Sequence, residues 1–516
     1  MNARKAIVFS DGIPQLTRPT NLRLERLLAV AACLTAAAAW AIYSRHGLIL
    51  SHYDAKAHLV VARRVFDNIT PGWQQFGAVW LPLPHLINVL PAQVDFFYRT
   101  GLFASFVSVL CLGVSVWAVA RLVVAITGSR AGAAIAALLL AWNPNLLYLY
   151  TTPMTEPLLL AALFLCLLWL YEWVQRDAQT VPVRLGLALF AATWTRYEAW
   201  PVLAVALVTT CAALWSRTGS LATTWQRAWR LCLWPAAAVL VFVVNSRITI
   251  GEWFVTAGFF VPDPTYQGQL ERTILGIWWG THQLSGYVIE SIALGAAAVA
   301  AVRACARRAE ASLLVPIAVW ATAALPFYAF ISGHPYRIRY MVPMAAACAL
   351  WCGIAIGRAS ERRVRAALVV AVIASAAIEA PLWKTHPAML EEAQWDVPAS
   401  LGRHSVTACL TREYRGDKIM ASMGSLAHYM QELSNDGLRV ADFVNEGNGI
   451  IWEAALEGGP AKHAGWMLVE EEAEGGDLLA QRLRTDAAFA HDMERVCEGG
   501  GVALYKRVSV RNARLQ

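Results

Sequence analysis

The sequence is poor in charged residues. Only 15% of its 516 residues are Asp, Glu, Lys or Arg, whereas a soluble domain carries about 25%. Hydrophobic residues make up 57% of the chain, and its mean hydropathy is +0.45. This balance excludes an ordinary soluble protein and predicts a chain that crosses a lipid bilayer several times.

Two further signals are missing from the sequence. No glycine-rich nucleotide-binding loop is evident, so a nucleotide is not the expected ligand. The basic segment 1–26 is followed by an apolar run without a small-residue cleavage site, which argues against a cleaved signal peptide and predicts a cytoplasmic N-terminal tail. The net charge of +7 resides in arginines of short loops, and this pattern indicates membrane topology instead of a nucleic-acid partner.

Long apolar runs fill residues 27–383. A membrane-spanning helix needs about 20 apolar residues, and we expect about eleven such helices here. They are expected at 27–45, 101–125, 131–150, 157–174, 183–195, 200–216, 231–249, 286–302, 313–331, 340–357 and 365–383. The sequence therefore predicts an all-α polytopic membrane bundle.

Arginine marks every second loop of this bundle, starting from the N-terminal segment. Because positively charged loops stay in the cytoplasm, we expect the alternate loops on the extracytoplasmic side, and we expect the membrane to be a bacterial inner membrane. The segments predicted to face the periplasm are the long first loop 46–100, then 143–157, 195–200, 250–285, 332–343 and the tail 384–516.

The composition changes in the tail 384–516, which is richer in Asp, Glu and Gly. Its short apolar segments are 406–410, 418–422, 466–470 and 502–507, and a helical pattern covers 480–496. Strands that alternate with helices predict a small extracytoplasmic α/β domain, and about 130 residues can form their own core. Cys409 and Cys497 lie in this tail; an oxidising compartment permits them to pair, and the sequence leaves the pairing open.

The predicted outer loops contain isolated carboxylates. Asp54 and His58 are four residues apart, so a helix places both on one face, in a spacing suited to acid–base chemistry or metal binding. The alternative for Asp54 is a solvated acid in a first helical turn. Glu156 lies at the outer end of a span, where an acid is costly unless it is paired or functional; beside Thr155 and Pro157 it also suits a helix start.

Arginines lie on the same predicted side of the membrane. Arg337 and Arg339 occur in an outer loop, against the usual distribution of positive charge. Because the arginine fork matches phosphate, we expect these residues to bind a phosphate group, with snorkelling to the interface as the alternative. Arg196 and Glu198 either form an ion pair across a short turn, or Arg196 receives an anion.

Aromatic residues are frequent in the first outer loop. Trp73, Trp80 and His85 are candidates for the walls of a sugar pocket, because aromatic rings stack on sugar faces. His58 and Glu198 are candidates for the same pocket. The alternative is an aromatic belt at the membrane interface.

Four ordered motifs resemble those of the C-type (GT-C) membrane glycosyltransferases. They are similar above all to glycosyltransferase family 39 and its relatives, the protein mannosyltransferases and the lipid A aminoarabinose transferase. The motifs are HYDAKAHLVVARRVFDNITPGWQQFGAVWLPLPHL, PMTEPLL, TRYEAW and RIRYMVP. The resemblance covers about residues 27–360 and implies a GT-C-like fold for the membrane part.

The resemblance also implies roles for single residues. Asp54 matches the essential acid of the first outer loop, although relatives often carry a second acid where this chain has Ala55. His58 stands where many relatives have Arg or Tyr. Glu156 matches a second acid implicated in metal or acceptor handling, and the segment Arg337–Tyr340 is similar to the loop on the phosphate side.

The function implied by this resemblance is transfer of a hexose or pentose from polyprenyl phosphate to an acceptor hydroxyl on a lipid, a glycan or a protein, with inversion. Asp54 is the expected general base. Arg337, Arg339 and Arg196 are expected to stabilise the charge on the leaving phosphate. The sugar and the acceptor are not identified by the sequence.

A divalent cation is a further expectation. Asp54, His58 and Glu156 are the candidate ligands for Mg²⁺, Mn²⁺ or Zn²⁺, which would also stabilise the leaving group. The departures from the family motif, including the absent second acid, leave metal dependence open.

Other functions fit parts of the same pattern. A transporter or flippase of a lipid-linked sugar also needs many spans and outer arginines, but it favours internal repeats and broken helices within the membrane. A ligase or polymerase of lipid-linked glycans differs in using a pyrophosphate donor. A non-catalytic scaffold is a third alternative, because the second acid is missing.

Overall fold

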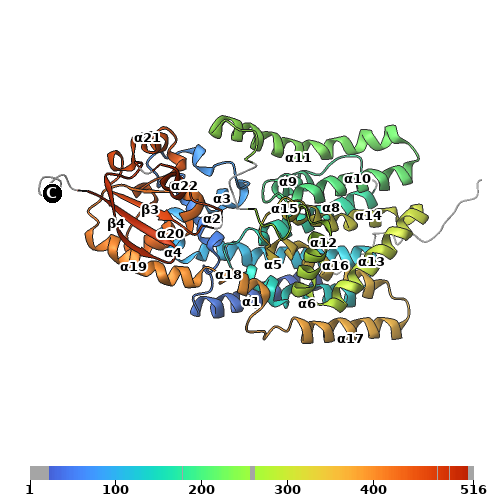
Figure 1. The fold of residues 1–516 in the computed structure, drawn as a ribbon. Helices are drawn as coiled ribbons and strands as arrows, with labels where there is room; N and C mark the ends of the chain where they lie inside the picture. Colours follow the sequence, from blue (N-terminus) through green and yellow to red (C-terminus); the bar gives the residue numbers. More distant parts are fainter. Residues whose placement is uncertain (1–22, 177, 256–261, 474, 487, 509–516) are drawn as a thin grey trace, which may run out of the picture.

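The computed structural model describes residues 23–508 except 177, 256–261, 474 and 487. These residues form an elongated molecule with a helical bundle at one end and a domain with a β-sheet at the other (Figure 1). The loop 46–100 folds against the sheet domain.

Eight helical segments of the described chain are long and apolar enough to cross a membrane. They are α1 (Arg23–Arg45), α5 (Leu102–Thr127), α8 (Glu156–Gln175), α10 (Ala199–Thr218), α11 (Leu221–Ile250), α13 (Tyr287–Ala306), the run Arg308–Ile331 with α14 (Leu314–Ile317) and α15 (Ala324–Ile331), and the run Ile338–Arg358 with η5 (Ile338–Met341) and α16 (Val342–Arg358). The protein is therefore a multi-pass membrane protein by length and composition, and eight predicted spans are confirmed.

Three predicted spans differ from these eight. The first ends early: α6 (Arg130–Ala141) stops before Asn143, whose side chain caps α7 (Pro144–Leu149) by accepting the N–H groups of Asn145 and Leu146. α9 (Val183–Thr193) is likewise a shorter apolar helix. α17 (Arg362–Glu379) begins with a cluster of arginines and is not among the eight. The count of eleven stays a prediction.

The centre of the bundle is formed by α5, α6, α8 and α16, which contain most of its fully buried side chains. Small residues let α6 and α16 approach closely. A Cβ atom on Gly132 would lie 2.4 Å from the carbonyl oxygen of Gly353, so both positions need glycine. Close contact through small residues is typical of helices packed in a membrane.

α11 and α17 lie along opposite outer sides of the bundle (Figure 1). Many of their apolar side chains are exposed, for example Leu240, Ile248 and Ile378. Exposed apolar side chains are favourable in contact with lipid and unfavourable in contact with water. They therefore indicate that a bilayer surrounds the bundle.

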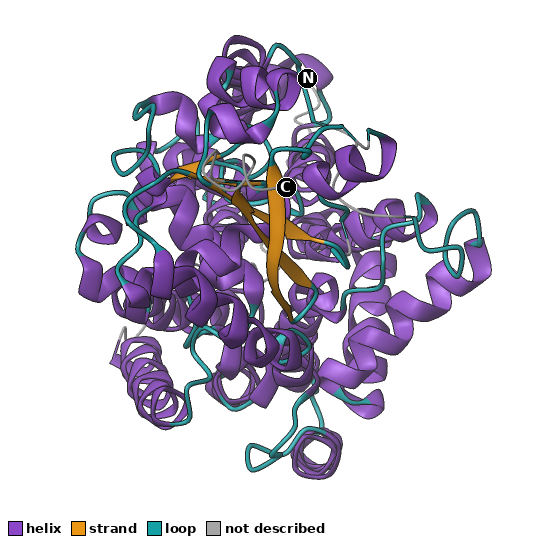
Figure 2. Ribbon diagram, turned by 60° about the vertical axis from the view of Figure 1, so that its left-hand side comes forward, coloured by secondary structure: helices purple, strands orange, loops and turns teal. Residues whose placement is uncertain are grey.

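The C-terminal domain contains a five-stranded sheet in the order β2-β1-β3-β5-β4 (Figure 2). β1 pairs in parallel with β2 and β3, whereas β5 is antiparallel to β3 and β4. The strands are β1 (Ile419–Ala421), β2 (Phe443–Val444), β3 (Trp466–Glu470), β4 (Met493–Gly499) and β5 (Val502–Arg507), and the larger helices are α19 (Val397–Glu413), α20 (Met423–Leu433), α21 (Ile450–Gly458) and α22 (Leu478–Thr485). A small α/β domain is thus confirmed.

Two local predictions for this domain are corrected. Segment 406–410 is part of α19, because Val406 and Leu410 are four residues apart and bury one helical face. The helical pattern over 480–496 continues only to the end of α22, and its last residues belong to β4. Cys409 of α19 and Cys497 of β4 form a disulfide, with their Cα atoms 6.5 Å apart.

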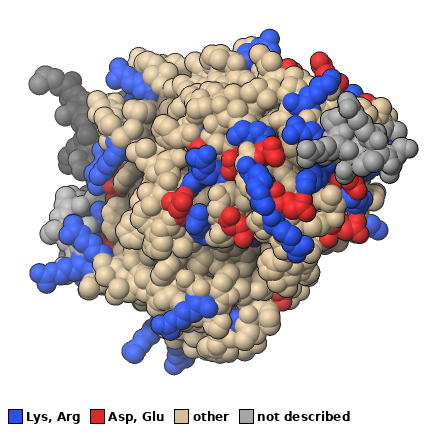
Figure 3. All heavy atoms as spheres, turned by 90° about the vertical axis from the view of Figure 1, so that its left-hand side faces the viewer, with Lys and Arg blue, Asp and Glu red and all other residues tan. Residues whose placement is uncertain are grey.

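The loop 46–100, between α1 and α5, is structured and covers the sheet domain. Its helices are α2 (Tyr53–Arg63), α3 (Leu83–Asn88) and α4 (Asp95–Thr100). Ala57 and Val60 of α2 share an apolar cluster with Leu426 and Met430 of α20. Acidic and basic side chains are intermixed on the opposite, outward face of this end (Figure 3), as is typical of a surface in water.

Candidate functional site

The site begins at the start of α2. His52 is the N-cap residue, and its Nδ1 accepts the backbone N–H of Asp54 at 3.1 Å. Asp54 lies in the first helical turn, where the helix dipole favours a negative charge. The helix start considered from the sequence is therefore present, but Asp54 is buried, with 6% of its surface exposed, and is not a solvated acid.

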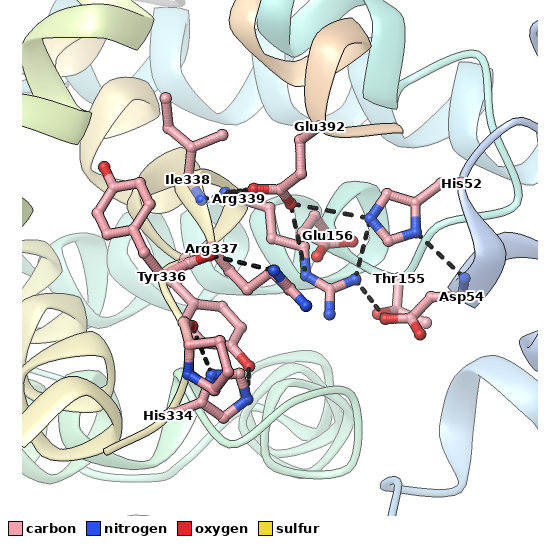
Figure 4. Close-up of polar contacts among 12 residues, drawn as sticks. His52, Asp54, Thr155, Glu156, His334, Tyr336, Arg337, Ile338, Arg339 and Glu392 are labelled. Atoms are coloured by element: carbon pink, nitrogen blue, oxygen red, sulfur yellow. Dashed lines mark hydrogen bonds and ion pairs between the residues drawn. The ribbon is translucent and has the colours of Figure 1, made fainter. Parts of the chain in front are cut away.

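Arg339 of η5 forms an ion pair with Asp54 (Figure 4). Its Nη1 donates to Asp54 Oδ2 and also lies 3.4 Å from Nε2 of His52. Burial favours a higher pKa for Asp54, but the charge of Arg339, with smaller contributions from His52 and His58, outweighs it and holds the pKa of this carboxyl below its usual range. The carboxylate of Asp54 and the guanidinium of Arg339 thus form a buried ion pair.

Glu392 of α18 (Ala388–Ala393) completes this group from the start of the tail. Its Oε2 accepts the backbone N–H groups of Ile338 at 2.5 Å and Arg339 at 3.4 Å, which fixes the turn that carries Arg339. Its Oε1 lies 3.8 Å from His52 Nε2 and 3.9 Å from Arg339 Nε. Burial favours a higher pKa for Glu392, but His52 and Arg339 lower it overall.

A second charged group contains Glu156, Arg196 and Glu198. Nη1 of Arg196 lies 3.0 Å from Glu156 Oε1, and its Nη2 lies 2.6 Å from Glu198 Oε1. Nη1 also donates to Thr155 Oγ1 at 2.8 Å. The ion pair predicted for the TRYEAW motif is therefore present. Glu156 is 1% exposed, and neither of its oxygens has a partner in hydrogen-bond geometry within the described chain, so it retains unused acceptor capacity.

His58, Trp80 and His85 form a third group. Nδ1 of His58 is 3.0 Å from Nε2 of His85, and the ring centroids of His58 and Trp80 are 4.2 Å apart. His58 also lines a small recess with Asn88 and Thr155. Burial, with a smaller effect of the Arg64 charge, lowers the pKa of His85 to about 3, so this ring is neutral over the physiological range.

The three groups interact electrostatically. Burial and the neighbouring His85 hold the pKa of His58 well below its usual value, and the charges of Asp54, Arg196 and Arg339 also act on it. Side chains from the loop 46–100, from the turn before α10 and from η5 therefore belong to one buried polar site at the end of the bundle that faces the sheet domain.

Other predicted site residues lie at its edge or outside it. Trp73 donates from Nε1 to Asn245 Oδ1 at 2.6 Å and is exposed. The Tyr340 hydroxyl is 3.1 Å from Nε2 of His334, and its ring lies 5.7 Å from the guanidinium of Arg339. Arg337 contacts the carbonyl of Tyr336 at 3.2 Å and the ring of Trp395.

The sequence did not single out His52 and Glu392. His52 was visible beside Asp54, as a residue type that can cap a helix. Glu392 carries no local signal, because it is one of many acids in the tail and its role depends on a contact with a loop more than fifty positions earlier.

The candidate metal ligands were tested against this geometry. Within residues 23–508, outside the gaps given above, no group of three or more His, Cys, Asp or Glu side chains is arranged to hold a metal ion. Asp54 is paired with Arg339, and His58 contacts His85. The three proposed ligands do not form a site in this arrangement, so no chemical step below is routed through an ion, and metal dependence stays a prediction.

No protein-family model matches the chain, and no curated protein matches it. The site itself and the four motifs are therefore the features of the chain that bear on its function.

Proposed function

We propose that the protein is a membrane glycosyltransferase that moves a sugar from a polyprenyl-phosphate donor to an acceptor hydroxyl. The observation that carries the proposal is the buried pair of Asp54 and Arg339. It joins a potential base to a potential phosphate ligand from segments 285 positions apart. Displacement of a sugar from a phosphate needs a base for the acceptor hydroxyl and a cation for the leaving phosphate, and this site contains both.

The reaction is a single displacement at the anomeric carbon. The acceptor oxygen forms a bond to that carbon while its proton passes to the carboxylate of Asp54. The bond between the anomeric carbon and the phosphate oxygen breaks, and its electron pair leaves with the lipid phosphate. Attack from the opposite face inverts the configuration.

Arg339 stabilises the phosphate as it leaves, because charge-assisted hydrogen bonds to an anion are strong in a buried site. Its Nε has no partner in hydrogen-bond geometry within the described chain, so a donor remains for an anion. Arg196 supplies a second buried positive charge. Glu156, with its unused acceptor oxygens, is suited to hold hydroxyl groups of the sugar or the acceptor.

The surroundings support a lipid donor. Eight candidate spans indicate a bilayer around the bundle, and a donor with a polyprenyl tail is soluble only there. Asp54 and Glu392 of the charged site (Figure 4) belong to α2 and α18, which lie at the bundle end next to the sheet domain (Figure 1). A lipid headgroup and a water-soluble or lipid-borne acceptor can meet there.

The test is a transfer assay with the purified full-length protein in lipid nanodiscs. A panel of radiolabelled polyprenyl-phosphate and polyprenyl-pyrophosphate sugars is offered to wild type, Asp54→Asn and Asp95→Asn. Asp95 is the matched control, because it is an acid of the same loop whose side chain is exposed and pairs with Arg63. We expect turnover of a monophosphate donor by wild type and Asp95→Asn, and its loss in Asp54→Asn with donor binding retained.

Two results contradict the proposal. Turnover confined to pyrophosphate donors favours a glycan ligase or polymerase. Movement of a lipid-linked sugar across reconstituted vesicles, without transfer of any donor and without an effect of Asp54→Asn, favours a transporter and leaves Asp54 as a helix-capping acid.

A further inference from the structure

The short helix that carries Asp54 is held from the C-terminal domain. Lys56 Nζ of α2 forms an ion pair with Glu432 Oε1 of α20 at 2.5 Å, and both groups are largely buried. Successive residues of an α-helix are rotated by about 100°, so Lys56 points about 200° away from Asp54. One side of α2 therefore faces Arg339 and the other faces Glu432.

The residue between His52 and Asp54 is also packed against the tail. The ring of Tyr53 meets the ring of Trp395 edge-on at 5.4 Å and that of His428 at 6.0 Å. His52 itself lies next to Glu392. Residues on both sides of Asp54 thus contact the stretch 392–432 of the tail.

Glu432 is fixed by a buried network. Arg403 donates to both of its oxygens, at 3.0 and 3.3 Å, and binds both oxygens of Asp396 at 2.8 and 3.1 Å. Arg403 is completely buried (0% exposed). Burial favours a higher pKa for Glu432, but Lys56 and Arg403 outweigh it and lower the pKa to about 2. The carboxylate that receives Lys56 is therefore charged and rigidly placed at all ordinary pH values.

α2 has few means of fixing its own orientation. It has 11 residues, and isolated helices shorter than about 12–15 residues are marginal in water. Its position must come from tertiary contacts. On the side opposite Asp54, the charged contacts are the pair of Lys56 with Glu432 near the start of the helix and the pairs of Arg63 with Asp67 and Asp95 at its end.

We propose that Lys56 and Glu432 are positioning residues through which the C-terminal domain holds α2 and aims Asp54 at the reacting groups. The catalytic part of this inference rests on the proposed function, since it takes Asp54 as the base. The domain is then a part of the transfer machinery and more than a cover over the site.

The experiment compares wild type, Lys56→Met, Glu432→Gln and Glu471→Gln as full-length proteins in nanodiscs. Glu471→Gln is the matched control, because Glu471 also pairs with an arginine, Arg495 at 2.9 Å, but on the exposed surface of the same domain. Two quantities are measured: hydrogen exchange of the α2 amides, which needs no substrate, and kcat and KM for the donor found in the transfer assay.

We expect the α2 amides of Lys56→Met and Glu432→Gln to exchange about tenfold faster than those of wild type. We expect kcat to fall by about 100-fold, as a displacement of about 1 Å produces, with KM for the donor within about twofold of wild type. Lys56→Arg, which keeps the charge, should restore most of kcat. Glu471→Gln should behave as wild type in both measurements.

The two proposals fail separately. Exchange in α2 that matches the Glu471→Gln control overturns the positioning role, whether or not sugar is transferred. If the α2 amides exchange faster in Lys56→Met but wild type transfers no sugar, Lys56 and Glu432 still position α2, and the proposed function is overturned. If Glu432→Gln does not fold, Lys56→Met still decides the question, because Glu432 keeps its partner Arg403 in that variant.

Discussion

Asp54 and Arg339 form a buried ion pair at the place where the loop 46–100 meets η5, the short helix before α16. The two opposite charges neutralise each other, since each is the main partner of the other. A paired carboxylate is a weak base, because its pKa is lowered. A phosphate that takes donors of Arg339 leaves Asp54 less strongly paired and therefore more basic.

This relationship predicts different pH profiles for two kinetic constants. The acid limb of kcat/KM reports the free enzyme, and that of kcat reports the enzyme with its substrate bound. Since Asp54 must be ionised to act as the base and Arg339 lowers its pKa only while the pair is intact, kcat/KM should persist to lower pH than kcat. Steady-state rates from pH 4 to 8 should show the acid limb of kcat, whereas kcat/KM should stay level to the low end of this range. Acid limbs that coincide contradict the release of Asp54.

A variant provides the control for this prediction. Arg339→Gln removes the charge that lowers the Asp54 pKa, so its kcat/KM limb should move to higher pH and meet its kcat limb. If the acid limb of kcat/KM stays at the same pH in Arg339→Gln, the group that titrates in this limb is not Asp54.

The sequence predicts those residues of the site whose charged side chains lie among apolar residues. Asp54, Glu156, Arg196 and Arg339 each lie beside a long apolar run, where an unpaired charge is costly, and the structure brings all four into one region. Trp73, a candidate from the same loop, lies outside the His58 group and contacts Asn245. Its sequence signal is weak, because the chain contains 22 tryptophans.

Other features depend on tertiary contacts and were not accessible from the sequence. Glu392 and Glu432 look like ordinary acids of a water-exposed domain, yet each has a partner in the distant loop 46–100, His52 for Glu392 and Lys56 for Glu432. The strands at 418–422 and 502–507 were predicted because they are short, apolar and bounded by turns. Segment 406–410 has the same appearance, and only its burial on one helical face distinguishes it.

Removing Arg196 should destabilise the fold. Arg196 compensates two buried acids, Glu156 and Glu198, and Arg196→Met leaves both without a cation. Loss of one partner of a buried pair costs about 3–5 kcal/mol of the free energy of unfolding. Thermal unfolding in one detergent should show a clearly lower Tm, and Glu198→Gln in the same chain should recover part of it. A Tm equal to that of wild type means that the acids are neutral or solvated.

The disulfide between Cys409 and Cys497 predicts a defined thiol count. Alkylation of the denatured protein without reduction should modify eight of the ten cysteines, and all ten after reduction. Cys409→Ala with Cys497→Ala should lower the free energy of unfolding by about 2–4 kcal/mol, the usual value for such a bond. Because a disulfide persists in an oxidising compartment, ten reactive thiols in protein from native membranes would contradict the extracytoplasmic position expected for the tail.

Glu470, the last residue of β3, gives the domain a distinct pH dependence. Burial raises its pKa to about 8 from a value of 4.5 in an unfolded chain. A carboxyl whose pKa is raised by folding stabilises the folded state only in its protonated form, so its contribution is fully present below pH 4.5 and is lost as the pH rises through 8. Wild type should therefore lose stability over this range relative to Glu470→Gln, which stays neutral.

Unfolding of both proteins at pH 5 and pH 9 measures this difference. Glu470→Gln should gain stability over wild type on going from pH 5 to pH 9, whereas Glu471→Gln, whose side chain is exposed and paired with Arg495, should show no such gain. A difference between wild type and Glu470→Gln that is the same at both pH values means that Glu470 keeps an ordinary pKa. The Glu470 side chain would then reach water at the end of the central strand β3.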